Sequence, residues 1–175
     1  MLLSFLSYGT VSWEDSDVWL LVDTQKMSME VKKGDKTVAI LDNIAIGRNG
    51  AGEKGHRGDD VTPVGSFRVG WINEKSAFHK FFGLTYPNVE HADSALRKGK
   101  IDINTYHSIA RAHDTGQVPP QDTSLGGQIG IHGLGSGSLA IHKSMNWTHG
   151  CIALTNDQID QLSRWVEKGT LVTVK

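Results

Sequence analysis

Features that are scarce in this chain limit the classes of protein to which it can belong. Its 175 residues include a single cysteine, Cys151, so no disulfide can form within the chain. The 18 basic residues are balanced by 19 acidic ones and form no long basic run, which gives no electrostatic support for a nucleic acid or an anionic membrane as partner. No stretch approaches the roughly 18 apolar residues of a membrane-spanning helix.

The first 17 residues, MLLSFLSYGTVSWEDSD, have only a short apolar run and no basic residue. A signal peptide needs a basic start and an apolar core of about 7–15 residues. We therefore expect residues 1–16 to be a tail: the remnant of such a peptide, the product of a misplaced gene start, or a segment whose apolar side chains pack on the fold. The remaining residues, 17–175, have a length that suits one domain.

The first hundred residues favour β-strands. An apolar run at residues 18–23, an alternating pattern at 27–32 and a third run at 37–41 are separated by turn residues, which predicts an antiparallel meander. The glycine-rich segment 47–58 lacks the Gly-Lys-Ser/Thr ending of a phosphate-binding loop and is interpreted as a surface loop. A Pro-Gly turn at residues 63–65 then leads into another strand.

Residues 88–128 have a different pattern, which predicts a helical insertion. Short helices are expected at residues 89–96 and 105–113, with Asn104 as the cap of the second helix. An apolar stripe supports the second helix: Ile103, Tyr106, Ile109 and Ala110. Because long irregular segments in compact domains often serve as lids, this insertion could cover a site; the alternative is a surface subdomain.

The last fifty residues return to strands at 128–132 and 138–142 and then to a helix. Thr155 followed by Gln158 is a capping box, which predicts a helix start. That helix would bury Ile159, Leu162 and Val166, end at Gly169 and lead into a closing strand at residues 171–175. The fold class is therefore predicted to be mainly β with α insertions (α+β).

Cys151 stands in the sequence Thr-His-Gly-Cys, which suits a nucleophile better than a buried structural thiol. A thiol with a pKa of about 8.5 is mostly protonated at neutral pH and needs a base, usually an imidazole, within reach. His132, His142 and His149 are near in sequence, and in an extended segment His149 would leave the chain on the same face as Cys151. Gly150 would allow close approach of a substrate to the backbone.

Two other interpretations of this segment stay open. Cys151 could be a small buried apolar residue. It could also join His132 and His149 in a Cys-His₂ zinc site, although the spacing matches no structural zinc motif and no acidic base stands nearby. The other histidines are expected at the surface or in hydrogen bonds; His79 is the strongest exception, because the aromatic run 78–82 could line a groove.

The pair His132-Gly133 and, further along, Thr148-His-Gly-Cys151-Ile resembles the signature of the YkuD-type L,D-transpeptidase domain. The strand entry Thr62-Pro-Val-Gly is similar to the same family. The segments Leu125-Gly-Gly-Gln-Ile-Gly-Ile-His-Gly and Trp147-Thr-His-Gly-Cys-Ile-Ala-Leu-Thr-Asn resemble its murein-acting YafK-like branch. The resemblance covers residues 17–175.

The resemblance implies an L,D-transpeptidase-type β-sandwich with the helical insertion at 88–128. It implies that Cys151 attacks the acyl donor and that His132, oriented by the carbonyl of Gly133, is the general base and acid. His149, Thr148, Gly150 and Gly133 would support the site or bind substrate.

The implied substrate is a peptidoglycan stem tetrapeptide, attacked between the L centre of a diamino acid and the terminal D-alanine. The resulting thioester would pass to an amine, as in cross-linking or D-amino-acid exchange, or to water. No metal or organic cofactor is implied. The implied location is the periplasm or cell envelope, the expected state is a monomer, and an envelope protein linked to murein is a further candidate partner.

One departure from the family pattern concerns the residue after Cys-Ile, where the family often has Arg or Asn and this chain has Ala153. The choice between transfer and hydrolysis therefore stays open. The alternatives are a cysteine hydrolase of the same fold (an L,D-carboxypeptidase or an amidase that releases an envelope protein) and a non-catalytic murein- or zinc-binding module. A papain-like peptidase ranks last, because papain-like chains place Cys before His.

Overall fold

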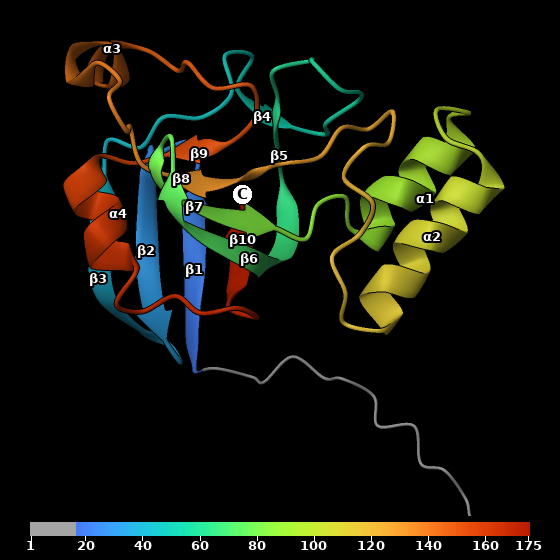
Figure 1. The fold of residues 1–175 in the computed structure, drawn as a ribbon, viewed down its shortest axis with the longest axis horizontal. Helices are drawn as coiled ribbons and strands as arrows, with labels where there is room; N and C mark the ends of the chain where they lie inside the picture. The colour runs from blue at the N-terminus through green and yellow to red at the C-terminus, as the bar shows by residue number, and fades with distance from the viewer. Residues whose placement is uncertain (1–16) are drawn as a thin grey trace, which may run out of the picture.

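The computed structural model describes residues 17–175, and the expected tail at residues 1–16 lies outside them. β1 (Val18–Asp23), β2 (Ser28–Lys33) and β3 (Lys36–Asp42) form the predicted antiparallel meander. Successive side chains of a strand point to opposite faces of the sheet, and Leu20 and Val22 of β1 and Met29 and Val31 of β2 are fully buried. These strands are blue in Figure 1.

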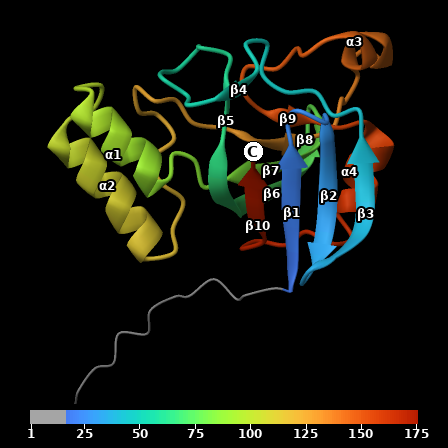
Figure 2. The ribbon, with the colours of Figure 1, turned by 180° about the vertical axis from the view of Figure 1, so that it is seen from behind.

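Eight strands hydrogen-bond in the order β3-β2-β1-β10-β6-β7-β8-β9. The other five are β6 (Gly65–Ser76), β7 (His79–Leu84), β8 (Gly130–His132), β9 (Ile152–Ala153) and β10 (Leu171–Val174). β10 lies parallel to β1 and antiparallel to the start of β6, and the rest of β6 pairs with β7. In Figures 1 and 2 the layer of β6–β8 crosses the layer of β1 and β10, and the mainly β class with inserted helices is confirmed.

The glycine-rich segment is an ordered loop, closed by the short parallel pair of β4 (Ala51–Gly52) and β5 (Thr62–Pro63). The Lys54 ammonium is buried in it and pairs with the Asp59 carboxylate, which also accepts hydrogen bonds from three backbone N–H groups. At the start of the loop Gly47 is required, because a Cβ there would lie 2.2 Å from the carbonyl oxygen of Asp60.

The insertion contains the two predicted helices, α1 (Val89–Arg97) and α2 (Ile103–Asp114). The expectation that Asn104 caps α2 is wrong: the cap is Asp102, whose carboxylate accepts the Thr105 N–H at 2.7 Å. Ile103, half exposed, does not belong to the buried stripe, which uses Ile109 and Ala112. Figures 1 and 2 show both helices beside β5 rather than over β8 and β9.

The strand expected at residues 138–142 is instead α3 (Leu139–Ser144). Ser138 caps this helix by accepting the N–H of Ile141, and His142 is buried while Leu139 and Ile141 are about half exposed. Five residues with alternating apolar side chains fit a strand and a single helical turn equally well, so the serine cap decides the structure.

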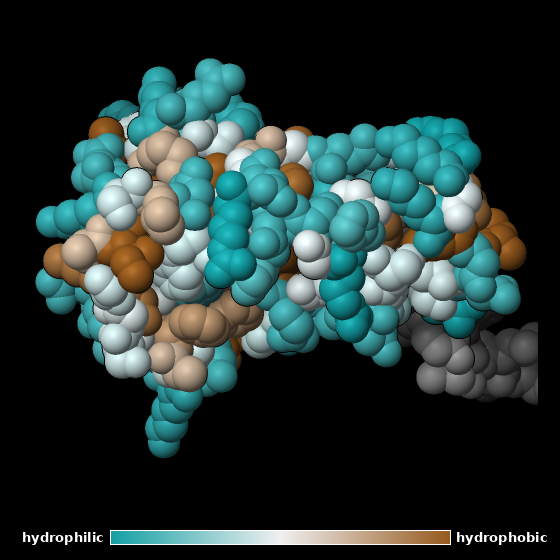
Figure 3. Space-filling view, turned by 90° about the horizontal axis from the view of Figure 1, so that it is seen from above, coloured by the Kyte–Doolittle hydropathy of each residue, from teal (hydrophilic) through white to brown (hydrophobic). Residues whose placement is uncertain are grey.

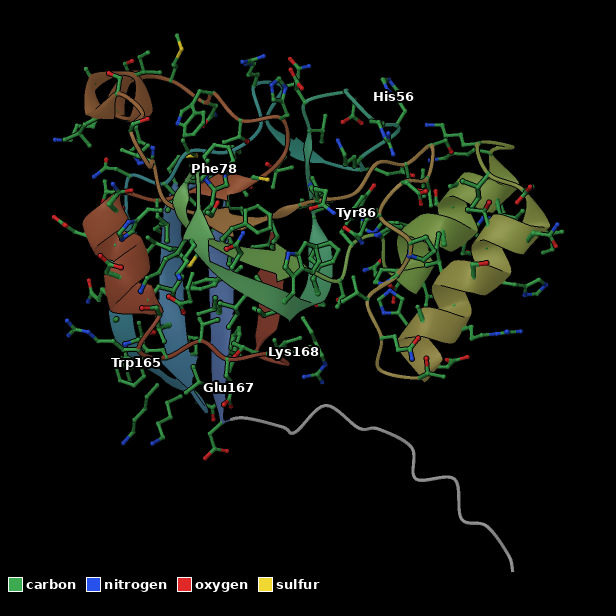
Figure 4. The ribbon with its side chains drawn as sticks, viewed as in Figure 1. His56, Phe78, Tyr86, Trp165, Glu167 and Lys168 are labelled. Carbon is green, nitrogen blue, oxygen red and sulfur yellow. The ribbon has the colours of Figure 1, made fainter. Side chains whose placement is uncertain are left out.

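α4 (Asn156–Leu162) begins with the predicted capping box of Thr155 and Gln158. The expectation that this helix ends at Gly169 is wrong, because Ser163 is its C-cap. Gly169 instead has φ 100° in the turn before β10 and donates its N–H to the Val69 carbonyl. Figure 4 shows the neighbouring Trp165, Glu167 and Lys168 at the opposite end of the sheet from Phe78.

Within residues 17–175 no helix is long and apolar enough to cross a membrane. Seen from above, the surface is mostly hydrophilic, with apolar patches over the strand-rich part and at the far end of the insertion (Figure 3).

Candidate active site

The parallel pairing of β8 with β9 brings the two motif segments together. His132 is the last residue of β8 and pairs in register with Ala153, so Cys151 directly precedes β9 on the neighbouring strand. His132 and Cys151 both line one cleft of about 550 Å³. Thr148 and His149 line the same cleft, while Gly133 and Gly150 are adjacent to lining residues.

His132 is held in one orientation and in one tautomer. Its Nδ1 lies 2.7 Å from the carbonyl oxygen of Gly133, which can only accept, so Nδ1–H donates and Nε2 is left as the acceptor. The ring contacts Phe78, tilted at 36° with 4.4 Å between centroids, and is nearly parallel to Phe81 at 6.1 Å. Burial lowers the pKa of His132, against the opposing effect of the Gly133 carbonyl. The imidazole is therefore neutral at pH 7.

The loop after His132 is fastened to the start of α4. The side-chain oxygen of Asn156 accepts the N–H groups of Leu134 and Gly135, both at 2.9 Å, and its amide donates to the Gly135 carbonyl. A Cβ on Gly133 would lie 2.7 Å from the carbonyl oxygen of Phe78, so glycine permits the close passage of the two chains. Asn156 thus fixes the backbone that orients His132.

Cys151 presents a half-buried thiol whose Sγ lies 3.4 Å from the carbonyl oxygen of Gln128. Burial raises its pKa from 9.0 to about 11, against the opposing effects of the Gly130 backbone and of the Lys54 charge. The resting thiol is therefore protonated at pH 7, and a thiol in this state needs a base to remove its proton before it can act as a nucleophile.

The turn before Cys151 is locked by Thr148. Its hydroxyl donates to the Cys151 carbonyl at 2.6 Å and accepts the Gly150 N–H at 3.1 Å. Gly150 has φ 125°, and a Cβ there would lie 2.8 Å from the carbonyl oxygen of Val61, so the position requires glycine. The side chain of His149 is 73% exposed and bonds the Asp60 carboxylate through Nδ1 at 2.7 Å.

Aromatic side chains form much of the cleft wall. Phe78 lies at the turn between β6 and β7, near β8 and β9 (Figure 4), so the expectation that the run 78–82 lines a groove is correct for Phe78 and Phe81. His79 does not line it and pairs instead with Asp160 at 2.9 Å. Trp147 packs edge-on to His132 at 5.7 Å and donates its indole N–H to His142 Nδ1 at 3.3 Å.

Four cleft residues belong to no sequence motif and were not predicted: Arg48, Trp71, Asn73 and Ser76. Gln128 and Trp147 also line the cleft; they lie within the family-like segments, but no site role was predicted for either residue. Gln128 is the one lining residue that the 88–128 insertion supplies, so α1 and α2 do not cover the cleft. As for the zinc interpretation, residues 17–175 contain no group of three or more His, Cys, Asp or Glu side chains placed to hold a metal ion.

The model of the YkuD L,D-transpeptidase catalytic domain matches residues 17–174. The chain belongs to the YkuD L,D-transpeptidase family. A comparison with curated proteins found no match.

Solved structures show the same fold as this YkuD domain. The helical cell shape determining protein Pgp2 from Campylobacter jejuni has a TM-score of 0.63 and 23% identity, and the match covers 94% of this chain and 49% of Pgp2. Bd1075 from Bdellovibrio bacteriovorus has a TM-score of 0.58 and 17% identity, and the match covers 95% of this chain and 50% of Bd1075. An L,D-transpeptidase mutant from Enterococcus faecium has a TM-score of 0.53 and 17% identity, and the match covers 91% of this chain and 50% of that protein. The chain therefore spans about half the length of these relatives.

Proposed function

We propose that this YkuD domain is a cysteine acyltransferase that acts on peptidoglycan stem tetrapeptides. The observation that carries the proposal is the placement of Cys151 and His132 in one cleft, with the imidazole held as a neutral base by Gly133. Family membership supports the substrate class and, through it, a place in the cell envelope. The whole protein's partners, including an envelope protein linked to murein, and its monomeric state are part of the same proposal.

The proposed reaction needs only one base and one nucleophile. His132 Nε2 takes the proton of the Cys151 thiol while Sγ bonds to the carbonyl carbon on the L centre of the diamino acid. The bond from that carbon to the nitrogen of D-alanine breaks, and His132 returns the proton to the leaving amine. The resulting thioester is then attacked at its carbonyl carbon by an amine or by water, with His132 Nε2 taking the proton of the attacking group. The bond from that carbon to Sγ breaks, and His132 returns the proton to Sγ, which regenerates the thiol.

Hydrolysis is a second candidate, and the lining of the cleft favours it over cross-linking to a cationic amine. No Asp or Glu side chain of the described residues lines the cleft, so such an amine finds no carboxylate there. Ala153, at the position where family members often carry Arg or Asn, is fully buried against Ala45 and supplies no polar group. Water needs neither contact.

The test is mass spectrometry of a murein tetrapeptide incubated with the protein and excess D-methionine. Replacement of the terminal D-alanine by D-methionine indicates transfer, and tripeptide alone indicates hydrolysis. Cys151→Ala, with its fold checked by circular dichroism, must abolish both products, whereas His79→Gln, outside the cleft, serves as the matched histidine control. Turnover by Cys151→Ala would refute the proposal. An untouched tetrapeptide would redirect the test to intact murein carrying a linked envelope protein, the amidase alternative.

A further inference from the structure

The cleft contains one permanently charged side chain. Among the lining residues of the described chain only Arg48 is a lysine or arginine, and none is an aspartate or glutamate. Lys54 exerts a charge effect on Cys151 but is itself buried, paired with Asp59 and not part of the lining. The lining therefore combines one permanent positive charge with aromatic rings and uncharged polar groups and has no carboxylate, which suits an anionic ligand.

Arg48 is fixed to the same backbone that carries Cys151. Its N–H donates to the Thr148 carbonyl at 3.0 Å, and Gly47 and Thr148 form a parallel bridge. The preceding N–H, of Gly47, donates to the Thr62 hydroxyl at 2.8 Å. Residue 48 thus sits beside the locked turn that leads into the nucleophile, although it lies about a hundred residues earlier in the chain.

The Arg48 guanidinium lies at the cleft, and its one ion pair within the described residues is a long one. Its ion pair with Asp60 measures 3.6 Å, too long for a hydrogen bond, and 54% of the side chain is exposed. Asp60 is engaged more closely by His149, whose hydrogen bond is the main cause that lowers the pKa of this carboxyl group. Asp60 stays ionised and steadies Arg48, while the fork of guanidinium N–H groups remains able to bind a carboxylate in a bidentate way.

A stem tetrapeptide ends in a free carboxylate one residue beyond the carbonyl that Cys151 would attack. Consecutive Cα atoms are about 3.8 Å apart, so this carboxylate enters the cleft together with the reacting bond. We infer that Arg48 binds the C-terminal carboxylate of the donor peptide and makes the enzyme specific for a free terminal acid. This inference rests on the proposed function and assigns to the glycine-rich loop the polar contact that Ala153 does not supply.

The experiment compares three synthetic tetrapeptides: the free acid, the same peptide with its terminal carboxylate amidated, and one amidated only on the side-chain carboxylate of the diamino acid. Loss of D-alanine or D-alanine amide is followed for the unmodified chain, Arg48→Gln, Arg48→Lys and the control Arg57→Gln. Arg57 belongs to the same loop but does not line the cleft. Binding of all three peptides to Cys151→Ala, with and without Arg48→Gln, is measured by calorimetry in parallel.

We expect the unmodified chain to prefer the free acid over the terminal amide by about 10- to 100-fold in kcat/KM, the range of a charge-assisted pair. The preference should reside mainly in KM, because the carboxylate is present before and during the reaction. Arg48→Gln should reduce it to about 1- to 3-fold, Arg48→Lys to an intermediate value, and Arg57→Gln should retain it. In calorimetry Cys151→Ala should bind the free acid more tightly than the terminal amide by a similar factor. The double variant Cys151→Ala, Arg48→Gln should bind the two peptides about equally.

Three results would overturn the inference: equal use of the free acid and the terminal amide by the unmodified chain, an undiminished preference in Arg48→Gln, or a preference that depends on Arg48 only for the side-chain carboxylate. If no peptide reacts, the proposed catalysis fails, and the calorimetric ratio decides on Arg48 separately. Absence of that ratio would then overturn the inference as well.

Discussion

The resting charge state of Cys151 and His132 leads to a quantitative prediction. Burial raises the thiol pKa from 9.0 to about 11, and burial also lowers the pKa of His132. At pH 7 the pair is thus a thiol and a neutral imidazole rather than a thiolate and an imidazolium. With a pKa of about 11, Cys151 carries about a hundredfold less thiolate at pH 7 than a thiol whose pKa is 9.0.

Alkylation by iodoacetamide measures this directly. A thiolate of higher pKa is more nucleophilic, with a Brønsted slope of about 0.4–0.5. This greater nucleophilicity raises the alkylation rate roughly tenfold and so offsets part of the hundredfold lower thiolate fraction. Cys151 should therefore react about tenfold more slowly than N-acetylcysteine at pH 7, and its rate should keep rising with pH to about 10 or beyond. Intact-protein mass spectrometry between pH 6 and 10.5 gives the profile, and Cys151→Ala gives the background.

The midpoint of that profile is independent of how easily the reagent enters the cleft. A plateau reached between pH 6 and 8, with a rate above that of the free thiol, would mean that Cys151 and His132 form an ion pair at rest, contrary to this prediction. The account also predicts that His132→Gln keeps the high midpoint, because a neutral imidazole does not stabilise a thiolate by charge.

Three further predictions concern stability. Burial lowers the pKa of His91, His132 and His142, so each of these histidines binds fewer protons in the folded than in the unfolded state. The free energy of unfolding from urea titrations should therefore fall as pH drops below about 6.5, by at most about 1.4 kcal/mol per pH unit for each histidine. A flat profile from pH 7 to 5 would contradict this. Trp147→Phe removes the donor to buried His142 and should lower the free energy of unfolding by about 1 kcal/mol, measured the same way; no change would argue against that hydrogen bond. Gly150→Ala forces φ 125° on a residue with Cβ and should cost about 2 kcal/mol or more; an unchanged midpoint of urea unfolding would show that the turn relaxes.

Several strands and one helix start can be predicted from local sequence. An apolar run predicts β1, alternation predicts β2, and a capping box predicts the start of α4, because each signal is complete within one segment. The motif segments around His132 and Cys151 predict that these residues share one site, and the parallel pairing of β8 with β9 brings the two segments together. The strand predicted at residues 138–142 is instead α3, because a pattern of five residues is too short to distinguish the period of a strand from that of a helix.

The rest of the site depends on contacts across long sequence separations. Asp60 meets His149, and Arg48 meets the Thr148 backbone, only because the glycine-rich loop folds back onto the cysteine segment. Neither residue belongs to a periodic pattern or a chemical motif. The position of α1 and α2 beside β5 (Figure 1), with no residue of either helix in the lining of the cleft, likewise follows from tertiary packing and not from their composition.

The central claim is that Cys151 carries the acyl group. The most direct measurement is intact-protein mass spectrometry of the chain mixed with tetrapeptide and quenched in acid, followed by tryptic mapping. The account predicts an added mass equal to the tripeptide acyl group, confined to the tryptic peptide of residues 144–164, removed by hydroxylamine and absent in Cys151→Ala. Turnover with no such adduct on that peptide, or an adduct that persists in Cys151→Ala, would contradict it.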